Sequence, residues 1–341
     1  MKINELPMKE EHERLVSCTD RNYRGLISIH NTRLGPAIGG TRFWQYRNEQ
    51  EAIRDVLRLA RGMTYKNALA GVPFGGGKSI ILKNDGPIDR ETIFRAHGRF
   101  VETFGGRYIT AEDVGTSPDD MEFVRTETQH VAGLMSGSGN PSPVTARGVY
   151  RAMQAAAKYR WGSDSLEGRT VAIQGCGSVG YYLASYLNKA GAHLIVSDVD
   201  QRKVDAVVKD FGAIAWGAED IYHADADIFA PCALGGVLND ETINVLKTEI
   251  VAGAANNQLL ESRHGDELAA RDILYAPDYA ANSGGVINGC RELLGWDSVQ
   301  AAAKVDEIYD TVFNIFQIAA AEGIATSKAA DRLAEERFKL D

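Results

Sequence analysis

The strongest constraint on the fold is a strand, a glycine-rich turn, a helix and a second strand in direct succession. Residues 170–177 read TVAIQGCG, an apolar run that ends in glycines, and residues 179–190 (VGYYLASYLNKA) show helical spacing of apolar side chains. Residues 192–200 (AHLIVSDVD) form a second apolar run that ends in acid. This order predicts a βαβ unit in which the glycine turn opens the helix.

The turn itself carries the spacing G-x-G-x-x-G. Gly175 makes the tight turn, Gly177 lets a pyrophosphate reach the helix N-terminus, and Gly180 lets the helix and strand pack closely. The backbone N–H groups from Ser178 and Val179 onward are suited to phosphate oxygens, because the helix dipole is positive at this end. We therefore predict a dinucleotide-binding turn that includes all five residues.

An acid follows at the position that selects between the two nicotinamide cofactors. Asp198 ends the second strand, 23 residues after Gly175. Its carboxylate is suited to accept hydrogen bonds from ribose hydroxyls and to repel a 2′-phosphate, which favours NAD over NADP. Arg202 is close enough to tolerate NADP. The alternative is a Rossmann-like domain that binds another ligand through the same turn.

The remaining pattern predicts an α/β protein of two domains. Short apolar runs such as DIFAPCAL, EIVAGAAN and ILYAPDYAAN each end in Gly, Asn or Pro, and the N-terminal part alternates strands and helices in the same way. The alternation from residue 170 onward predicts a parallel sheet covered on both faces. A chain of 341 residues suits two domains, and residues 136–143 (SGSGNPSP) are the predicted linker.

Composition excludes several classes of partner. The net charge of −9 argues against a nucleic-acid partner, which needs clustered positive charge. No apolar run approaches the ~20 residues of a membrane span, and the charged N-terminus does not resemble a secretory signal. We expect a cytoplasmic protein. The cysteines and histidines are scattered without metal-ligand spacing, so we predict neither a disulfide framework nor a metal site: Cys18, Cys176, Cys232, Cys290, His12, His30, His97, His130, His193, His223 and His264.

Lys78 lies in GVPFGGGKSIIL, which has some features of a phosphate-binding loop. That loop requires glycine at position 72, where this chain has valine, and a helix after the lysine, where this chain has an apolar strand pattern. A lysine between three glycines and a strand is predicted to be partly desolvated, which lowers its pKa toward neutral and makes it a usable base.

Two other charged residues are candidates, each with a simpler interpretation. Asp113, in TAEDVG, follows a predicted strand at the end where α/β active sites collect, although a helix or turn cap is the alternative. Lys66, in MTYKN, lies near the end of a long amphipathic helix, where a solvated surface charge is the alternative.

These segments together resemble one enzyme family. The motifs MTYKNALAG, FGGGKS, TAEDVGT, GNPSPVTARGV, QGCGSVG, DIFAPCALGG, GAANNQL and APDYAANSGGVIN are similar to those of the Glu/Leu/Phe/Val class of amino-acid dehydrogenases. The resemblance runs from about residue 25 to the C-terminus and is strongest to the leucine-specific members, with the phenylalanine-specific members next. It implies NAD-dependent oxidative deamination of an L-amino acid to a 2-oxo acid and ammonia, by a homo-oligomer (dimer or octamer).

The resemblance also implies the domain division and the role of each motif. It implies a substrate domain over 1–138, a Rossmann-type NAD-binding domain over 139–318 and a C-terminal helix over 319–341 that packs back on the first domain. Lys66 pairs with the substrate carboxylate, Lys78 activates the water that attacks the imine, and Asp113 exchanges protons with the amino group. Further backbone and cofactor-side positions are Gly39, Gly40, Pro143, Thr145, Ala254, Asn256 and the turn Asn282-Ser283-Gly284-Gly285.

The pocket for the substrate side chain is implied in the same way. It consists of the apolar positions Ile38, Ala111, Val286 and Gly289, with Asn282 beside them. The absence of charge disfavours glutamate and predicts an apolar amino acid, leucine or another branched-chain one first. Leucine-specific members usually carry a branched residue where this chain has Gly289, so a widened pocket for phenylalanine is the second expectation. A bulkier indole or diamino substrate and a non-catalytic NAD-binding homologue are further alternatives.

Overall fold

The computed structural model describes residues 1–8, 11–84, 86, 88–134 and 139–339 of the chain. Backbone packing divides it into two compact units. Unit 1 comprises Met1–Gly139, Gly289–Trp296 and Glu335–Asp341, and unit 2 comprises Asn140–Asn288 and Asp297–Ala334. The predicted α/β class with two domains is confirmed.

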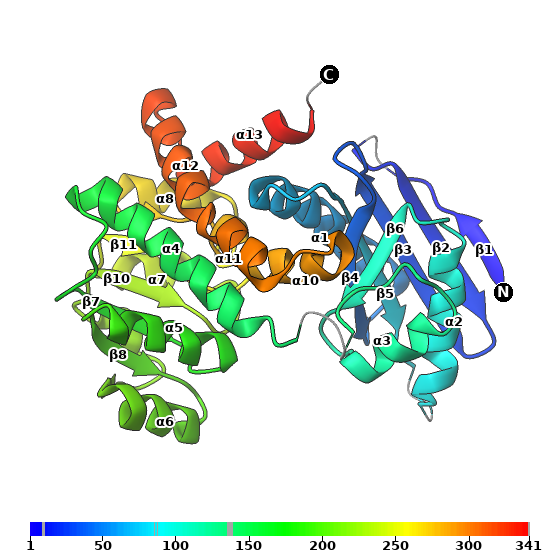
Figure 1. Cartoon of the computed structure of the whole chain (residues 1–341), viewed down its shortest axis with the longest axis horizontal. Coiled ribbons are helices and arrows are strands. Elements are labelled where there is room, and N and C mark those ends of the chain that lie inside the picture. The colour runs from blue at the N-terminus through cyan, green and yellow to red at the C-terminus, as the bar shows by residue number, and fades with distance from the viewer. Residues whose placement is uncertain (9–10, 85, 87, 135–138, 340–341) are drawn as a thin grey trace. The chain divides into compact units, whose positions relative to one another are not determined.

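Unit 1 is built on a mixed six-stranded sheet with the order β1-β2-β3-β5-β4-β6 (Figure 1). Strands β1, β2, β3 and β5 pair antiparallel, whereas β4 is parallel to both β5 and β6. Its elements are β1 (Lys2–Glu5), β2 (Arg14–Asp20), β3 (Tyr23–Asn31), β4 (Ala37–Trp44), α1 (Glu49–Ala70), β5 (Gly75–Leu82), α2 (Arg90–Glu102), β6 (Tyr108–Glu112) and α3 (Pro118–Arg125).

Helices cover both faces of this sheet because the strands carry apolar side chains on both. Leu26 and Ile80 pack with Val56 of α1 on one face, and Ile27 and Ile81 pack with α2 and α3 on the other. The three helices begin with side-chain caps at Asn48, Asp89 and Ser117.

The three consecutive glycines lie inside β5, and they allow neighbouring backbone to approach it. A methyl group on Gly75 would lie 2.0 Å from the carbonyl oxygen of Asn31, and one on Gly76 would lie 2.0 Å from the backbone nitrogen of Thr64 in α1. A methyl group on Gly77 would lie 2.8 Å from the Tyr108 ring. Gly76 therefore lets α1 pack directly on the strand that carries Lys78, while Gly75 and Gly77 leave room for the Asn31 backbone and the Tyr108 ring.

A buried hydrogen-bond network joins α2 to the sheet on the face opposite α1. The imidazole of His97 bonds the Tyr23 hydroxyl at 2.7 Å and the Thr41 hydroxyl at 2.9 Å. Thr41 also bonds Ser79 at 2.8 Å and Thr110, so the network reaches β3, β4, β5 and β6. All five side chains are at most 2% exposed. Burial lowers the pKa of His97 to about 3, so its imidazole stays neutral.

This burial predicts an acid-dependent loss of stability. An unfolded histidine titrates near 6.5, so between pH 6.5 and the folded pKa the unfolded state binds a proton that the folded state does not. The stability that the neutral His97 contributes is complete above pH 6.5 and falls as the pH falls. We expect the difference in free energy of unfolding between the wild type and His97→Gln to shrink by about 2 kcal/mol from pH 8 to pH 5. Urea unfolding at both pH values checks this, and an unchanged difference contradicts it.

Unit 2 is a parallel six-stranded sheet with the order β12-β11-β10-β7-β8-β9. Figure 1 labels four of its strands, β11, β10, β7 and β8. Each described pairing in it is parallel. Counted from β7, the first strand, this is the order of a dinucleotide-binding Rossmann sheet. Its elements are α4 (Ser142–Trp161), β7 (Thr170–Gln174), α5 (Ser178–Lys189), β8 (His193–Ser197), α6 (Gln201–Phe211), β9 (Ile214–Ala215), η1 (Asp220–His223), β10 (Ile228–Pro231), α7 (Asp240–Val245), β11 (Ile250–Val251), α8 (Arg263–Ala270), β12 (Leu274–Tyr275), α9 (Asp278–Ala281), α11 (Ser298–Asp306) and α12 (Ile308–Glu322).

Strand order in unit 2 reverses at β7, which lies between β8 and β10. The predicted βαβ unit is β7, α5 and β8, and α5 packs against both strands. On the other side of the sheet an apolar cluster that includes Phe229, Ile243 and Leu268 packs η1, α7 and α8 against it. Ligands of open α/β sheets bind at the carboxyl ends of the strands beside such a reversal.

Two late helices belong partly to each unit. Helix α10 (Gly284–Leu294) begins in unit 2, but its residues from Gly289 on group with unit 1. Helix α13 (Thr326–Phe338) groups with unit 1 from Glu335 on, where the Tyr65 hydroxyl donates to Glu335 at 2.6 Å and Arg337 donates to the carbonyls of Ala68 and Leu69.

Two late segments group with unit 1, and the predicted linker overlaps a helix. Residues 289–296 and 335–341 group with unit 1, whereas residues 319–334 group with unit 2. Residues 136–138 of the predicted linker lie outside the described residues. The end of that linker is wrong, because Ser142 and Pro143 form the first turn of α4, where the fixed φ of proline suits a helix.

Candidate functional site

Lys78 is a buried lysine in the middle of β5. Its side chain is 6% exposed, and its Nζ lies 2.7 Å from Oδ2 of Asp113. Asp113 comes directly after β6 and is 23% exposed, with its backbone N–H donating to the Thr116 hydroxyl at 2.9 Å. The two predicted catalytic side chains are thus in direct contact, although they are far apart in sequence.

The surroundings shift both ionisations. Burial lowers the pKa of Lys78, and the neighbouring carboxylate of Asp113 only partly offsets this. Burial also raises the pKa of Asp113, but the Lys78 ammonium, its hydrogen bond and the Arg42 guanidinium outweigh it, so the net pKa is below the ordinary value. The pair therefore combines an ionised carboxylate with an ammonium that loses its proton more easily than usual.

Arg42 is a member of this site that the sequence analysis missed. It lies on β4, with Nε 3.3 Å from Oδ2 of Asp113 and Nη1 2.9 Å from Oδ2 of Asp55 on α1. The motif GGTRFW was considered only for its glycines. The signal that could have found Arg42 is a charged residue two positions after Gly40 in a strand that ends beside Asp113.

The glycine pair of β4 lies between β5, which carries Lys78, and β6, which precedes Asp113. Gly40 pairs with Ala111 of β6, and a methyl group on it would lie 2.7 Å from Cβ of Asp113. The carbonyl of Gly39 accepts a hydrogen bond from the Tyr108 hydroxyl at 2.7 Å. The missing side chain at Gly40 therefore lets the Asp113 segment approach β4.

The other predicted substrate positions in unit 1 lie on three elements. Lys66 is half-buried in α1, beside Asn67, whose amide donates to the carbonyl of Gly75 at 2.6 Å. Ile38 is buried on β4 and pairs with Gly76. Gly289 lies on α10, and a methyl group there would meet no described atom within 4 Å.

The glycine turn of unit 2 follows β7 and opens α5. Gly175 has a φ of +102°, and a methyl group on Gly180 would lie 2.0 Å from the carbonyl oxygen of Gly175, so the helix packs directly on the turn. A methyl group on Gly177 would meet no described atom within 4 Å. No described side chain caps the helix at Gly177, which leaves the amides of its first turn available to a phosphate.

Asp198 is held beside this turn by two backbone hydrogen bonds. Its Oδ2 accepts from the N–H of Cys176 at 2.8 Å, and its Oδ1 accepts from the N–H of Asp200 at 2.9 Å. Arg202, which could tolerate a 2′-phosphate, is 88% exposed and forms two hydrogen bonds with the Asp200 carboxylate. A 2′-phosphate at this position would thus meet Asp198 and an arginine already paired with an acid.

A second group of predicted residues in unit 2 follows β11 and β12. The side-chain amide of Asn282 donates to the carbonyl of Ala254 at 3.0 Å and to Oδ1 of Asn256 at 2.9 Å. Its own Oδ1 is buried and has no described partner, which suits a ligand donor. Thr145, in the first turn of α4, donates to the carbonyl of Pro141 at 3.0 Å. Val286 is half-buried on α10.

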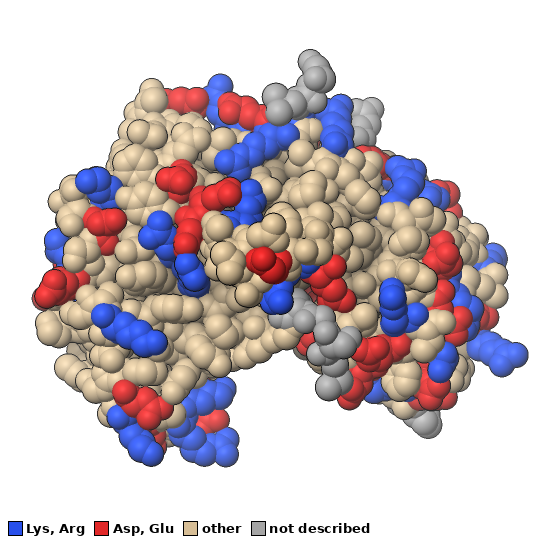
Figure 2. All heavy atoms as spheres, in the orientation of Figure 1, with Lys and Arg blue, Asp and Glu red and all other residues tan. Residues whose placement is uncertain are grey.

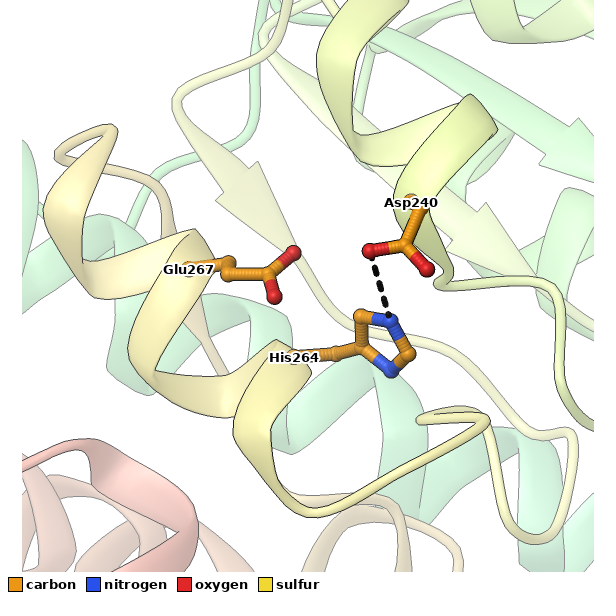
Figure 3. Close-up of side chains that lie close together, drawn as sticks. All are labelled: Asp240, His264 and Glu267. Atoms are coloured by element: carbon orange, nitrogen blue, oxygen red, sulfur yellow. Dashed lines mark ion pairs between the residues drawn. The ribbon is translucent and has the colours of Figure 1, made fainter.

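One cluster of described residues has the spacing of metal ligands (Figure 3). Ligand atoms of Asp240, His264 and Glu267 lie within 4.8 Å of one another. The guanidinium of Arg263, however, contacts both carboxylates of the cluster and also Glu261. A cation is therefore already present where a metal ion would bind, and the cluster is best explained as an ion-pair network.

Comparisons with known proteins agree with this geometry. Residues 12–130 match the family model described as Glu/Leu/Phe/Val dehydrogenase, dimerisation domain. Residues 137–205 and 198–339 match the model described as Glutamate/Leucine/Phenylalanine/Valine dehydrogenase. The chain belongs to this family. The resemblance inferred from the motifs is confirmed, and the chain is an amino-acid dehydrogenase.

Individual members of the family are similar over nearly the whole chain. A leucine dehydrogenase of Bacillus subtilis is 52% identical over 97% of this chain and 92% of its own length. A valine dehydrogenase of Streptomyces albus is 47% identical over 96% of this chain and 92% of its own length. The crystal structure of an L-tryptophan dehydrogenase from Nostoc punctiforme is 45% identical, with a TM-score of 0.88 over 96% of both chains.

The charge on the surface and the hydropathy of the helices are relevant to the expected partners. Figure 2 shows Lys and Arg side chains intermixed with Asp and Glu on the face that it draws, consistent with a chain whose net charge is −9. Within the described part of the chain, no helix has the length and hydropathy needed to cross a membrane.

Proposed function

We propose that this dehydrogenase catalyses the NAD-dependent oxidative deamination of an apolar L-amino acid to its 2-oxo acid and ammonia, and the reverse reductive amination. The observation that carries the proposal is the buried contact of Lys78 with Asp113, in a chain that belongs to the amino-acid dehydrogenase family. Buried pairs with perturbed pKa values are typical of sites that move protons.

The protein's side chains divide the work of the reaction. Bound NAD supplies the acceptor for the hydride of the substrate α-carbon. Asp113 takes a proton from the substrate amino group, so that the imine can form. Lys78, as the amine, takes a proton from the water that attacks the imine carbon, which leads to loss of ammonia. Lys66 binds the substrate α-carboxylate, and the backbone at Gly39 and Gly40 lies beside it.

NAD is the cofactor that the unit 2 site fits best. The amides after Gly177 and the open space above it suit a pyrophosphate. The Asp198 carboxylate suits the ribose hydroxyls, and its charge disfavours the 2′-phosphate of NADP. Thr145, Ala254, Asn256 and Asn282 complete the proposed cofactor side, with Ser178, Val179 and Gly180 in the turn.

Leucine and the other branched-chain amino acids are the proposed substrates. The proposed pocket positions, Ile38, Ala111, Val286 and Gly289, carry no charge, and several relatives at 51–52% identity are leucine dehydrogenases. A second candidate is an aromatic amino acid, which the open space at Gly289 favours and for which the relative named an L-tryptophan dehydrogenase is a precedent.

We also propose that the enzyme is a cytoplasmic homo-oligomer, a dimer or an octamer. The family model that matches residues 12–130 is described as a dimerisation domain, which supports assembly through unit 1. The scattered free thiols support a reducing compartment. The formation of 2-oxo acid and ammonia by such an assembly requires no nucleic-acid or membrane partner.

The first test is activity with a panel of L-amino acids at alkaline pH. NADH formation, measured at 340 nm, is expected with leucine, valine, isoleucine or phenylalanine in the presence of NAD. Lys78→Ala is expected to lose about 10²–10⁴-fold in kcat, because it removes the general base. Lys83→Ala, at the exposed end of the same segment, is the matched control and is expected to keep wild-type activity.

Two results would contradict the proposal. One is the absence of NADH formation with every amino acid of the panel, despite measurable binding of NAD. The other is an equal loss of activity in Lys78→Ala and Lys83→Ala. The loss would then not be specific to Lys78, and Lys78 would have no special role as the general base.

Two substitutions in the glycine turn separate an effect on folding stability from an effect on cofactor binding. Gly180→Ala places a methyl group against the Gly175 carbonyl and is expected to lower the free energy of unfolding by about 1–3 kcal/mol. Gly177→Ala has room for its methyl group, so it is expected to fold normally and to bind NADH at least tenfold more weakly. Thermal unfolding without cofactor and NADH fluorescence titration measure the two effects. Unweakened NADH binding by Gly177→Ala would argue against the proposed pyrophosphate position.

Gly289 tests the breadth of the substrate pocket. Gly289→Val adds a branched side chain where no described atom is within 4 Å of the new Cβ, so it should narrow the pocket without a clash at that atom. We expect the ratio of kcat/KM for leucine to that for phenylalanine to rise about 10–200-fold. Gly62→Val is the control, since Gly62 is an exposed helical glycine with the same free space. An unchanged ratio in Gly289→Val excludes this position from the pocket.

A further inference from the structure

Asp113 has two cationic partners on the same carboxylate oxygen. Lys78 Nζ lies 2.7 Å from Oδ2, and Arg42 Nε lies 3.3 Å from the same atom. The two cations come from adjacent parallel strands, β5 and β4, and the carboxylate comes from the end of β6 on the other side of β4. The contact of Arg42 is therefore built into the strand order.

The proposed reaction makes a lone Lys78–Asp113 pair unsuitable. Lys78 acts as a base only after it has lost its proton, and its positive charge is then lost as well. With Lys78 as its only partner, Asp113 would become an uncompensated carboxylate in a largely buried place, which is unfavourable. Deprotonation of the lysine would then be opposed by the very contact that positions it.

Arg42 supplies a charge that does not change during the reaction. A guanidinium stays protonated throughout the working pH range of proteins. Its other end is fixed, because Nη1 lies 2.9 Å from Asp55, which also accepts from the Tyr46 hydroxyl at 2.7 Å and from Arg58 at 2.9 Å. Asp55 is 16% exposed, so the guanidinium is held between two partly buried carboxylates.

We propose that Arg42 is a positioning residue whose permanent charge keeps Asp113 ionised while Lys78 cycles between ammonium and amine. The proposal rests on the proposed function for its catalytic meaning. Its direct physical claim is that removing the charge of Arg42 makes the Lys78 ammonium harder to deprotonate. Burial lowers the pKa of Lys78, and the Arg42 charge acts in the same direction.

Other charged and titratable groups surround the pair and stay in place in the test. They are Glu112 and Tyr108 on β6, Asp55 and Arg58 on α1, and Tyr46 after β4. Because none of them is changed, a shift in the Lys78 titration can be assigned to the substituted residue.

The experiment compares Arg42→Met, Arg42→Gln and Arg42→Lys with the wild type. Arg42→Met and Arg42→Gln are neutral, and Arg42→Gln keeps a hydrogen-bond donor. Arg42→Lys keeps a positive charge. Arg54→Met, an exposed arginine on α1, is the control. Thermal unfolding identifies the variants that fold. If one of the two neutral variants does not fold, the other can still be measured.

Two readouts are measured for each variant. The first is the acidic limb of the pH profile of kcat/KM for the best amino acid of the panel. The second is the pH dependence of reductive methylation of Lys78 by formaldehyde and cyanoborohydride, followed by peptide mass spectrometry without substrate or cofactor. We expect the neutral variants to shift both midpoints to higher pH by about one unit or more, with activity regained at alkaline pH. Arg42→Lys and Arg54→Met are expected to stay near the wild type.

The outcomes separate the proposal from the function on which it rests. A neutral variant with reduced activity at every pH and an unchanged methylation midpoint overturns the proposal, because Arg42 then acts only on structure. A shift in Arg42→Met that is absent in Arg42→Gln also overturns it, because a hydrogen bond and not the charge would be responsible. A shifted methylation midpoint in an enzyme inactive toward all amino acids supports the charge role of Arg42 and contradicts the proposed function.

Discussion

The ion pair between Lys78 and Asp113 is the interaction on which the rest of unit 1 depends. Transferring both charges out of water is unfavourable unless the geometry is good and further partners are present. The strand order β5-β4-β6 supplies that geometry, since it brings a lysine in one strand to within 2.7 Å of an acid at the end of another. The order in turn requires a small residue at Gly40, where a Cβ atom would lie 2.7 Å from Cβ of Asp113.

The two faces of this sheet have different chemistry for a physical reason. On the α1 face, Arg42 forms ion pairs with Asp113 and Asp55, so the charges there compensate one another. On the α2 face, neutral hydroxyls and the neutral imidazole of His97 satisfy one another in full burial. Ser79 and Thr41 directly follow Lys78 and Gly40 along their strands, so the neutral network fixes the same strands that carry the charges. A rigid neutral layer beneath a charged layer limits the rearrangement that a change of protonation causes.

The parts that sequence reasoning predicted are those with local causes. The turn from Gly175 to Gly180, for example, depends on neighbours within a few residues. Lys78 and Asp113 were also found singly, from a glycine run and a strand end. Strand β4 was missed because its central glycines and Arg42 are poor strand signals. The His97 network was missed because its partners lie on four strands that meet only in the folded sheet. Ser142 and Pro143 were assigned to the linker because Pro and Ser are common both in linkers and in first helical turns.

Both units hold the carboxylates that we propose to bind ligands in place through contacts within the fold. In unit 1, the carboxylate of Asp113 is fixed by two cations and by the strand end that carries it. In unit 2, the carboxylate of Asp198 is fixed by the backbone N–H groups of Cys176 and Asp200. A carboxylate that is already oriented needs little rearrangement when a ligand hydroxyl or amino group arrives. Folding therefore orders these carboxylates. The proposed binding and proton-transfer steps then do not include the free energy of ordering them.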